Sequence, residues 1–256
     1  MQTTNRAAAT FGLAAGLLLA SFGLASAADL GSKRAAKPAP AAAEPAVRNF
    51  DWTGFYLGVN GGLGQENSGW TLTSDGFKTG QDVTGGVVGS HTGFLRQFGR
   101  WVAGIDVDAD WANARGTASC NAPVFCTTNI KGLEALQARL GVAQGSWLLY
   151  ATGGMAWEQI ERRVTSTKNP NFLEIAGPET SRGWVIGAGV DTALTSNVTF
   201  GLNYQHYMFG AENLSFIDQT TGKAQDNTDF AAQAIKVIEA RLSFKFGGSE
   251  RHTPLK

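Results

Sequence analysis

The sequence predicts an all-β fold, namely a closed eight-stranded antiparallel up-and-down transmembrane barrel with short periplasmic turns and long outer loops. Three observations lead to this prediction. Glycine is unusually frequent, at 33 of 256 residues, and charged residues make up only 16%, against about 25% in typical soluble domains. Apolar and polar residues alternate at a period of two in eight segments, which is typical of β-strands. Short connections between these segments alternate with long ones.

Residues 1–49 precede the predicted barrel. Residues 1–27 contain one basic residue and an apolar stretch that is short for a membrane-spanning helix, and they end in a small-x-small pattern. These features indicate a signal peptide, so we expect cleavage between Ala27 and Ala28; an uncleaved membrane anchor is the alternative. Residues 28–49 are rich in Ala and Pro, which predicts an extended periplasmic arm.

The segment from Trp101 to Trp111 shows the alternation most clearly. Its apolar residues share one face, with a tryptophan at each end, and three aspartates lie on the other face. A water-soluble barrel needs apolar residues inside, whereas a barrel in lipid needs an apolar outer face with aromatic residues at both interfaces. Because hydrocarbon cannot satisfy the polar groups of an open sheet edge, we expect the sheet to close on itself.

The connections between the segments fall into two groups. Three are short, at 96–100, 144–146 and 195–197, and four are long and polar, near 65–80, 114–130, 160–181 and 211–231. We therefore expect strands of about 9–13 residues, four long outer loops, and both ends of the barrel on the short-turn side. The barrel is expected over residues 50–246, followed by a C-terminal extension over 247–256.

The inward faces of the predicted strands carry charges of both signs. An eight-stranded barrel has an interior that side chains fill, so we expect no open channel. Buried charges must pair, which predicts an internal salt-bridge network with Asp106 and Arg139 as the first pair. The expected interior charges are Asp106, Asp108, Asp110, Arg139, Glu158, Asp191, Glu239, Arg241 and Lys245. The inward glycines that leave room for them are Gly58, Gly62, Gly89, Gly93, Gly187, Gly189 and Gly201.

Several short motifs resemble those of small outer-membrane proteins of alphaproteobacteria. They are Phe50–Gly58 followed by Asn60-Gly61-Gly62, then Gly85–Gly89, Gly104-Ile105-Asp106, Ala138–Gly141 and Leu149–Gly154. This porin-like family has an eight-stranded barrel similar to the OmpA transmembrane domain. The resemblance implies a protein of the bacterial cell outer membrane, exposed at the surface, with structural, antigenic or host-contact roles. Some relatives are reported to bind haem.

The last predicted strand resembles a signal for membrane insertion. Leu242, Phe244 and Phe246 match the C-terminal pattern that the barrel-assembly machinery reads in this family. This chain differs from the family pattern because residues 247–256 follow the phenylalanine. The resemblance therefore implies the assembly machinery as a partner, through a signal that is internal rather than terminal.

Other candidate sites have simpler explanations. Cys120 and Cys126 lie in a polar stretch, and we expect a loop disulfide that stiffens a tip, since two cysteines without a nearby histidine make a poor zinc site. The three aspartates at 106–110 lack the glycine of a calcium loop. Contact of His206 and Tyr207 with haem is an alternative to an ordinary interfacial role. We expect no catalytic residue, metal or cofactor.

The sequence thus predicts a structural, surface-exposed outer-membrane protein, not an enzyme, that contributes to envelope integrity and to contact with a host or the environment. The expected partners are outer-membrane lipid and lipopolysaccharide, the barrel-assembly machinery and host surface molecules. The formal charge of zero argues against nucleic acid. The alternatives are a small porin-like solute channel and ligand binding by the loops, for example of haem.

Overall fold

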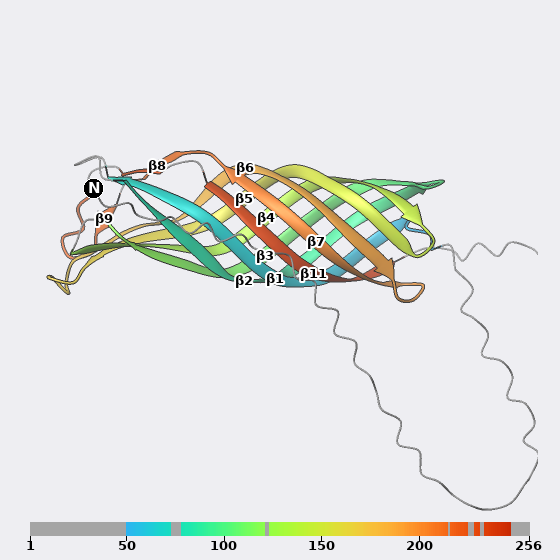
Figure 1. Ribbon diagram of the computed structural model, residues 1–256, viewed down its shortest axis with the longest axis horizontal. Coiled ribbons are helices and arrows are strands. Elements are labelled where there is room, and N and C mark those ends of the chain that lie inside the picture. The colour runs from blue at the N-terminus through green and yellow to red at the C-terminus, as the bar shows by residue number, and fades with distance from the viewer. Residues whose placement is uncertain are drawn as a thin grey trace, which may run out of the picture. The chain divides into compact units, whose positions relative to one another are not determined.

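The computed structural model describes residues 50–72, 78–120, 123–214, 216–224, 228–230 and 233–246. In this part of the chain eleven β-strands form one sheet (Figure 1). None of the described residues belongs to a helix that is long and apolar enough to span a membrane. The predicted signal peptide, periplasmic arm and C-terminal extension lie outside the described residues.

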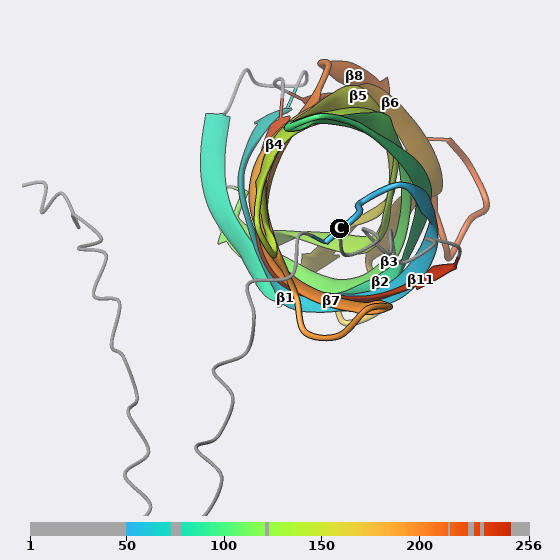
Figure 2. The ribbon, with the colours of Figure 1, turned by 90° about the vertical axis from the view of Figure 1, so that its right-hand side faces the viewer.

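Eight strands form a closed ring (Figure 2). They are β1 (Gly54–Leu72), β2 (Lys78–Phe98), β3 (Trp101–Ser119), β4 (Val124–Gln144), β5 (Trp147–Ser166), β6 (Leu173–Ala193), β7 (Val198–Phe209) and β11 (Gln233–Phe246). Each pairs antiparallel with its neighbours, and β1 pairs with β11 from Phe55↔Phe246 to Asn67↔Ala234, which closes the sheet. The prediction of a closed eight-stranded antiparallel barrel is confirmed.

Three short strands lie in the connection between β7 and β11. They are β8 (Glu212–Leu214), β9 (Ile217–Asp218) and β10 (Thr228–Phe230). β10 pairs with the end of β1 and with β8, and β9 pairs with the start of β6. This connection therefore attaches to the projecting ends of two strands of the wall.

The strands are longer than predicted. β1 to β6 have 19–21 residues each, and only β7 and β11 are shorter, with 12 and 14. The prediction of long loops near 65–80, 114–130 and 160–181 was wrong, because most of these residues continue the hairpins. A strand remains stable wherever a neighbour pairs with its backbone groups, in water as in lipid. The polar composition of these stretches therefore marked a change of environment, not the end of the strands.

An apolar belt surrounds the ring. It consists of the outward-facing residues from Phe55 to Leu63 on β1 and their counterparts on the other seven strands. Trp101 and Trp111, at the two ends of the belt on β3, are 54% and 72% exposed. Beyond the belt, outward positions of β1 to β6 are polar, such as Asn67 and Asp82. We call the end where these six strands project the extended end, and the opposite end the short-turn end.

Tight turns join the strands at the short-turn end. Gly99 and Gly145 have φ values of 63° and 62°, a left-handed conformation that glycine adopts without steric cost. They occupy the two-residue turns between β2 and β3 and between β4 and β5. The pairing of Phe55 with Phe246 places the start and the finish of the described barrel at this same end, as expected.

The seam between β1 and β11 can be tested by cross-linking. Val59 and Leu242 are register partners and both are exposed, so the variant Val59→Cys/Leu242→Cys should form a second disulfide on mild oxidation. The register control is Val59→Cys/Ile238→Cys, whose sites are offset by four residues, about 13 Å along the strand, and should not cross-link. The measurement is gel mobility with and without reductant. Equal cross-linking of both variants would contradict the closed ring.

Candidate functional site: the lumen and the extended end

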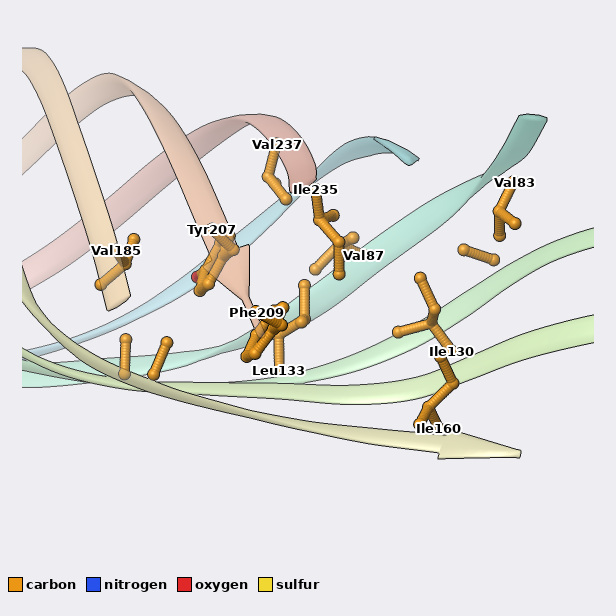
Figure 3. Packing of buried hydrophobic residues seen from close by; sticks show 13 residues of the cluster. Val83, Val87, Ile130, Leu133, Ile160, Val185, Tyr207, Phe209, Ile235 and Val237 are labelled. Atoms are coloured by element: carbon orange, nitrogen blue, oxygen red, sulfur yellow. The ribbon is translucent and has the colours of Figure 1, made fainter. Parts of the chain in front are cut away.

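Side chains fill the lumen in layers along the barrel. Near the short-turn end lies an apolar cluster of Trp52, Tyr56, Leu95, Val102, Leu148 and Tyr150. A layer of charged and amide side chains follows. A larger apolar cluster, which includes Val83, Ile130, Leu133, Ile160, Phe209 and Ile235, comes next (Figure 3). The extended end holds a third cluster, made of Trp70, Cys120, Cys126, Val164, Ala176 and Phe216.

The large apolar cluster is a part of the interior that the predicted inward charges and glycines did not include. Figure 3 shows its side chains pointing inward from facing walls, with Ile235 on β11 and Ile130 and Ile160 on β4 and β5. Outside the belt the outward residues are polar, so apolar residues inside gain the ordinary hydrophobic stabilisation of a soluble barrel. On β4 and β5 register shifts interrupt the period of two between Ile130 and Gly132 and between Ile160 and Arg162. On β2 and β11 the period continues without a shift, and Val83 and Ile235 keep the inward face.

Arg139 on β4 lies at the centre of the charged layer. It forms the expected ion pair with Asp106 on β3 and donates to Asp191 on β6, with Nη1 3.0 Å from Oδ2. Its guanidinium carbon lies 4.0 Å from the centroid of the Tyr150 ring, close enough for a cation–π contact. The hydroxyl of Tyr56 donates to Asp106. Arg139 thus connects β3, β4, β5 and β6 across the lumen.

Arg241 on β11 connects the opposite wall to Asp106, which it shares with Arg139, and to Asp108. Its Nη2 lies 2.9 Å from Asp108 Oδ1 and 3.5 Å from Asp106 Oδ1. Gln137 also donates to Asp108, at 2.7 Å. Asp106, Asp108, Arg139 and Arg241 are at most 3% exposed, so their charges are stabilised by one another rather than by water.

Amides connect the remaining carboxylates of the layer. The Nδ2 of Asn60 donates to Asp110 at 2.6 Å and to Glu239 at 2.9 Å. Asn203 donates to the other oxygen of Glu239 at 3.2 Å. His91 contacts Ser243 Oγ through Nε2 at 2.7 Å. The sequence interpretation did not include Asn60, Asn203 and His91, although each shares the inward face of its strand with a predicted residue or glycine.

Two predicted interior charges lie at other levels of the lumen. Glu158 on β5 is buried nearer the extended end, opposite Leu133 and Ser181 in register. Lys245 is buried at the short-turn end, where its Nζ donates to the backbone oxygen of Asp51 and lies 4.3 Å from the centroid of the Phe50 ring. Lys245 is therefore a support for the start of the barrel rather than a member of the salt-bridge network.

A strap formed by residues 50–53 crosses the short-turn end. The backbone nitrogen of Phe50 donates to Gly145 in the β4–β5 turn at 3.3 Å, and that of Trp52 donates to Gln97 on β2 at 2.9 Å. Trp52 is only 3% exposed. Beneath it, a cavity of about 20 Å³ touches Arg139, Asp191 and Lys245, which is room for about one water molecule.

The inward glycines lie against the large side chains of the layer. A Cβ atom at Gly89 would meet Asp110, one at Gly93 would meet Tyr56, and one at Gly201 would meet Asp191. Gly58, Gly62, Gly187 and Gly189 similarly face His91, Glu239, Thr152 and Tyr150. Each glycine therefore provides the space that a neighbouring lumen side chain occupies.

The disulfide between Cys120 and Cys126 is present, with the two Cα atoms 5.8 Å apart. It lies at the tip of the β3–β4 hairpin, as expected, but both residues are at most 1% exposed, so the bond is buried rather than open to water. The disulfide packs in the third cluster with Trp70, Val164 and Phe216. It therefore joins the ends of β3 and β4 inside an apolar layer that fills the extended end.

His206 and Tyr207 lie on opposite faces of β7. They are adjacent on β7, where successive side chains point to opposite faces. Tyr207 is fully buried in the lumen and stacks near Phe209, while His206 is on the outer face. Leu242, Phe244 and Phe246 all face outward on β11, where they form part of the apolar belt.

A closed ring with an apolar outer belt, aromatic belt edges and a polar inner layer defines an outer-membrane β-barrel protein. The chain belongs to the outer membrane protein beta-barrel domain family, whose model matches residues 15–237. The 31 kDa outer-membrane immunogenic protein of Brucella melitensis is 24% identical over 223 residues, covering 82% of this chain and 90% of that protein. The 22 kDa outer membrane protein of Rhizobium leguminosarum is 29% identical over 155 residues, covering 60% and 63%.

The barrel is also similar to a solved structure. OprG from Pseudomonas aeruginosa superposes with a TM-score of 0.51 at 14% identity, covering 78% of this chain and 100% of that chain. In proteins of this class the short turns face the periplasm and the longer connections face outward. The short-turn end is therefore periplasmic and the extended end lies at the cell surface.

The ion pairs of Arg139 can be tested by substitution. Arg139→Met keeps much of the side-chain volume but leaves Asp106 and Asp191 without their guanidinium, and should lower the free energy of unfolding by about 3–5 kcal/mol. Urea unfolding in lipid vesicles, followed by tryptophan fluorescence, measures the change. Arg100→Met, at an exposed turn position, should alter stability by less than about 0.5 kcal/mol. Equal effects would contradict a stabilising network.

The glycine positions provide a second test within one strand. Gly89→Ala places a methyl group against Asp110 and the backbone of Ala109, whereas Gly86→Ala meets no atom within 4 Å. We expect Gly89→Ala to lower stability by about 1–3 kcal/mol and Gly86→Ala to leave it nearly unchanged. The stability of each refolded variant is measured as the urea concentration at the midpoint of unfolding and compared with that of the unmodified protein. A neutral Gly89→Ala would show that the lumen has spare room.

Proposed function

We propose that this protein is a structural barrel that neither conducts solutes nor catalyses a reaction, and that displays a rigid rim at the cell surface. In this role it contributes to envelope integrity and to contact with a host or the environment. The observation that carries the proposal is the combination of a filled lumen with a wall that projects beyond the apolar belt. The first feature argues against passage, and the second provides an exposed surface.

The side chains of the lumen support a non-conducting role. Arg139 and Arg241 reach the same aspartate from different walls, so the charged layer extends across the barrel. The apolar cluster around Ile130 and Ile160 lies beyond it, and burial of charged solutes among such residues is costly. A solute would have to break both layers, and this is why we favour the structural role over the porin-like alternative.

The extended end supports a role in display. Six strands project beyond the belt, and the disulfide and Trp70 pack inside them, so the rim is held in one conformation without help from lipid. The Brucella relatives are named outer-membrane immunogenic proteins, a name that fits exposure at the surface. A rigid, polar rim suits contact with molecules outside the cell.

Planar-bilayer recordings test the absence of conduction. The refolded protein should give no discrete openings in 1 M salt. Tyr56→Ala/Arg139→Ala, which removes two side chains from the inner layers, serves as a comparison that can become leaky, and its folding is checked by the change in gel mobility on boiling. Discrete openings of the unmodified protein that scale with salt would contradict the proposal.

Labelling of intact cells tests the display. Lys168 is exposed in the connection between β5 and β6, whereas Lys245 is buried at the periplasmic end. An amine reagent that does not cross the membrane should modify Lys168 and leave Lys245 unmodified, as measured by mass spectrometry. Because Lys245 is buried, it should be modified only after the protein is unfolded by boiling in detergent. Labelling of Lys168 only in lysed cells would place the extended end on the periplasmic side and contradict the proposal.

A further inference from the structure

Three cations form a cluster on one side of the extended end. Arg115 on β3, Lys131 on β4 and Arg163 on β5 all face outward and are exposed. Register places Arg115, Asn129 and Glu161 side by side on three adjacent strands. We call Arg115, Lys131 and Arg163 the basic face.

Glu161 holds two of these cations in place. Its carboxylate accepts from Lys131 Nζ at 2.6 Å through Oε2 and from Arg163 Nε at 2.6 Å through Oε1. Hydrogen bonds from Lys131 and Arg163 keep the pKa of Glu161 below its usual range, so the anchor remains ionised at neutral pH. Lys131 and Arg163 are still about half exposed, at 47% and 46%, and keep N–H groups available for another anion.

Arg115 has no such anchor. It forms no ion pair or side-chain hydrogen bond with any part of the chain that the structure describes. The basic face therefore has three cations and one carboxylate, Glu161, among them; a second carboxylate, Asp82, faces outward on β2, two residues from Thr84, the register partner of Arg115. Closer to the belt, the exposed Glu134 on β4 and Arg182 on β6 offset one another in charge.

The basic face lies where lipid headgroups are found. Trp111, at the outer edge of the belt on β3, is the register partner of Gly132, the residue after Lys131. A bulge removes Lys131 from the strand register, and bulges commonly redirect a side chain in this way. Arg115 is four residues beyond Trp111, about 13 Å along a tilted strand. The headgroup region extends roughly 5–8 Å beyond the hydrocarbon in each leaflet, within reach of both side chains.

Beside the basic face, the outward residues of β1 and β2 are polar or acidic. They are Gln65 and Asn67 on β1 and Asp82 and Thr84 on β2, where Thr84 is the register partner of Arg115. At this height β11 carries one exposed cation, Lys236, the register partner of Gln65. The cations are gathered over three strands, which is the arrangement that a single multiply charged headgroup can contact at once.

We propose that the basic face binds the phosphate groups of a phosphorylated glycolipid in the outer leaflet. This inference rests on the proposed function, because it requires the extended end to face outward. The bound lipid would attach the rim of the barrel to the membrane on one side, in addition to the burial of the belt. Guanidinium groups would bind phosphate oxygens in pairs, and Lys131 would act as a point charge.

The test uses the full chain in micelles of an uncharged detergent. Lipid A with two phosphates is titrated, and the unfolding temperature is read from gel mobility without boiling. Lipid A should raise this temperature in a saturable way. Arg115→Gln/Lys131→Gln should need roughly 25-fold more lipid A for half of the effect, since each cation near an anionic headgroup contributes about fivefold. The matched control Arg96→Gln/Arg100→Gln removes two exposed periplasmic cations and should behave like the unmodified protein.

Two further arms identify the source of the anion. Lipid A without phosphates should give no shift, and sodium phosphate at equal phosphate concentration should not replace lipid A. Equal responses of the two double variants, or an equal effect of free phosphate, would overturn the proposal. If the double variant does not refold, the single variant Arg115→Gln is used in its place. Discrete channel openings, or labelling of Lys168 only in lysed cells, would instead refute the proposed function, so failure of one proposal can be told from failure of the other.

Discussion

The architecture depends on the need to pair every backbone N–H and C=O group within hydrocarbon. Pairing of β1 with β11 meets this need by removing the two free edges. Closure then fixes which face of each strand meets lipid and which meets the lumen. Because eight strands enclose a lumen that side chains must fill, closure also requires the inward residues to fit together. The ion pairs of Arg139 and Arg241 and the glycines opposite them are consequences of that one constraint.

The barrel changes its polarity along its length. Within the belt, apolar side chains meet lipid and charges lie inside, as around Asp106. In the extended end, polar side chains face outward and residues such as Ile130 and Ile160 fill the interior. One continuous sheet serves both environments because the backbone pairing is the same in each. Only the side chains on the two faces exchange roles at the outer edge of the belt.

This change of polarity gives the extended end a stability of its own. The cluster of Trp70, the disulfide and Phe216 packs inside strands that no longer touch lipid. A rim with an apolar interior can present polar and charged groups outward without losing its conformation. The proposed roles in display and in lipid binding both use this property, since Lys131 and Arg163 are held in place on a paired strand surface rather than on a mobile loop.

The closed eight-stranded ring, the apolar belt and the interior position of Asp106, Asp108 and Arg241 could be predicted from the sequence. These features follow from a period of two, which is a local property of each strand. The ends of the strands, the burial of the disulfide, and the second ion pair of Arg139, with Asp191 on a distant strand, became visible only in the folded barrel. Such features depend on which strands face each other across the lumen and on register shifts such as that near Lys131. Periodicity within a single segment carries no information about either.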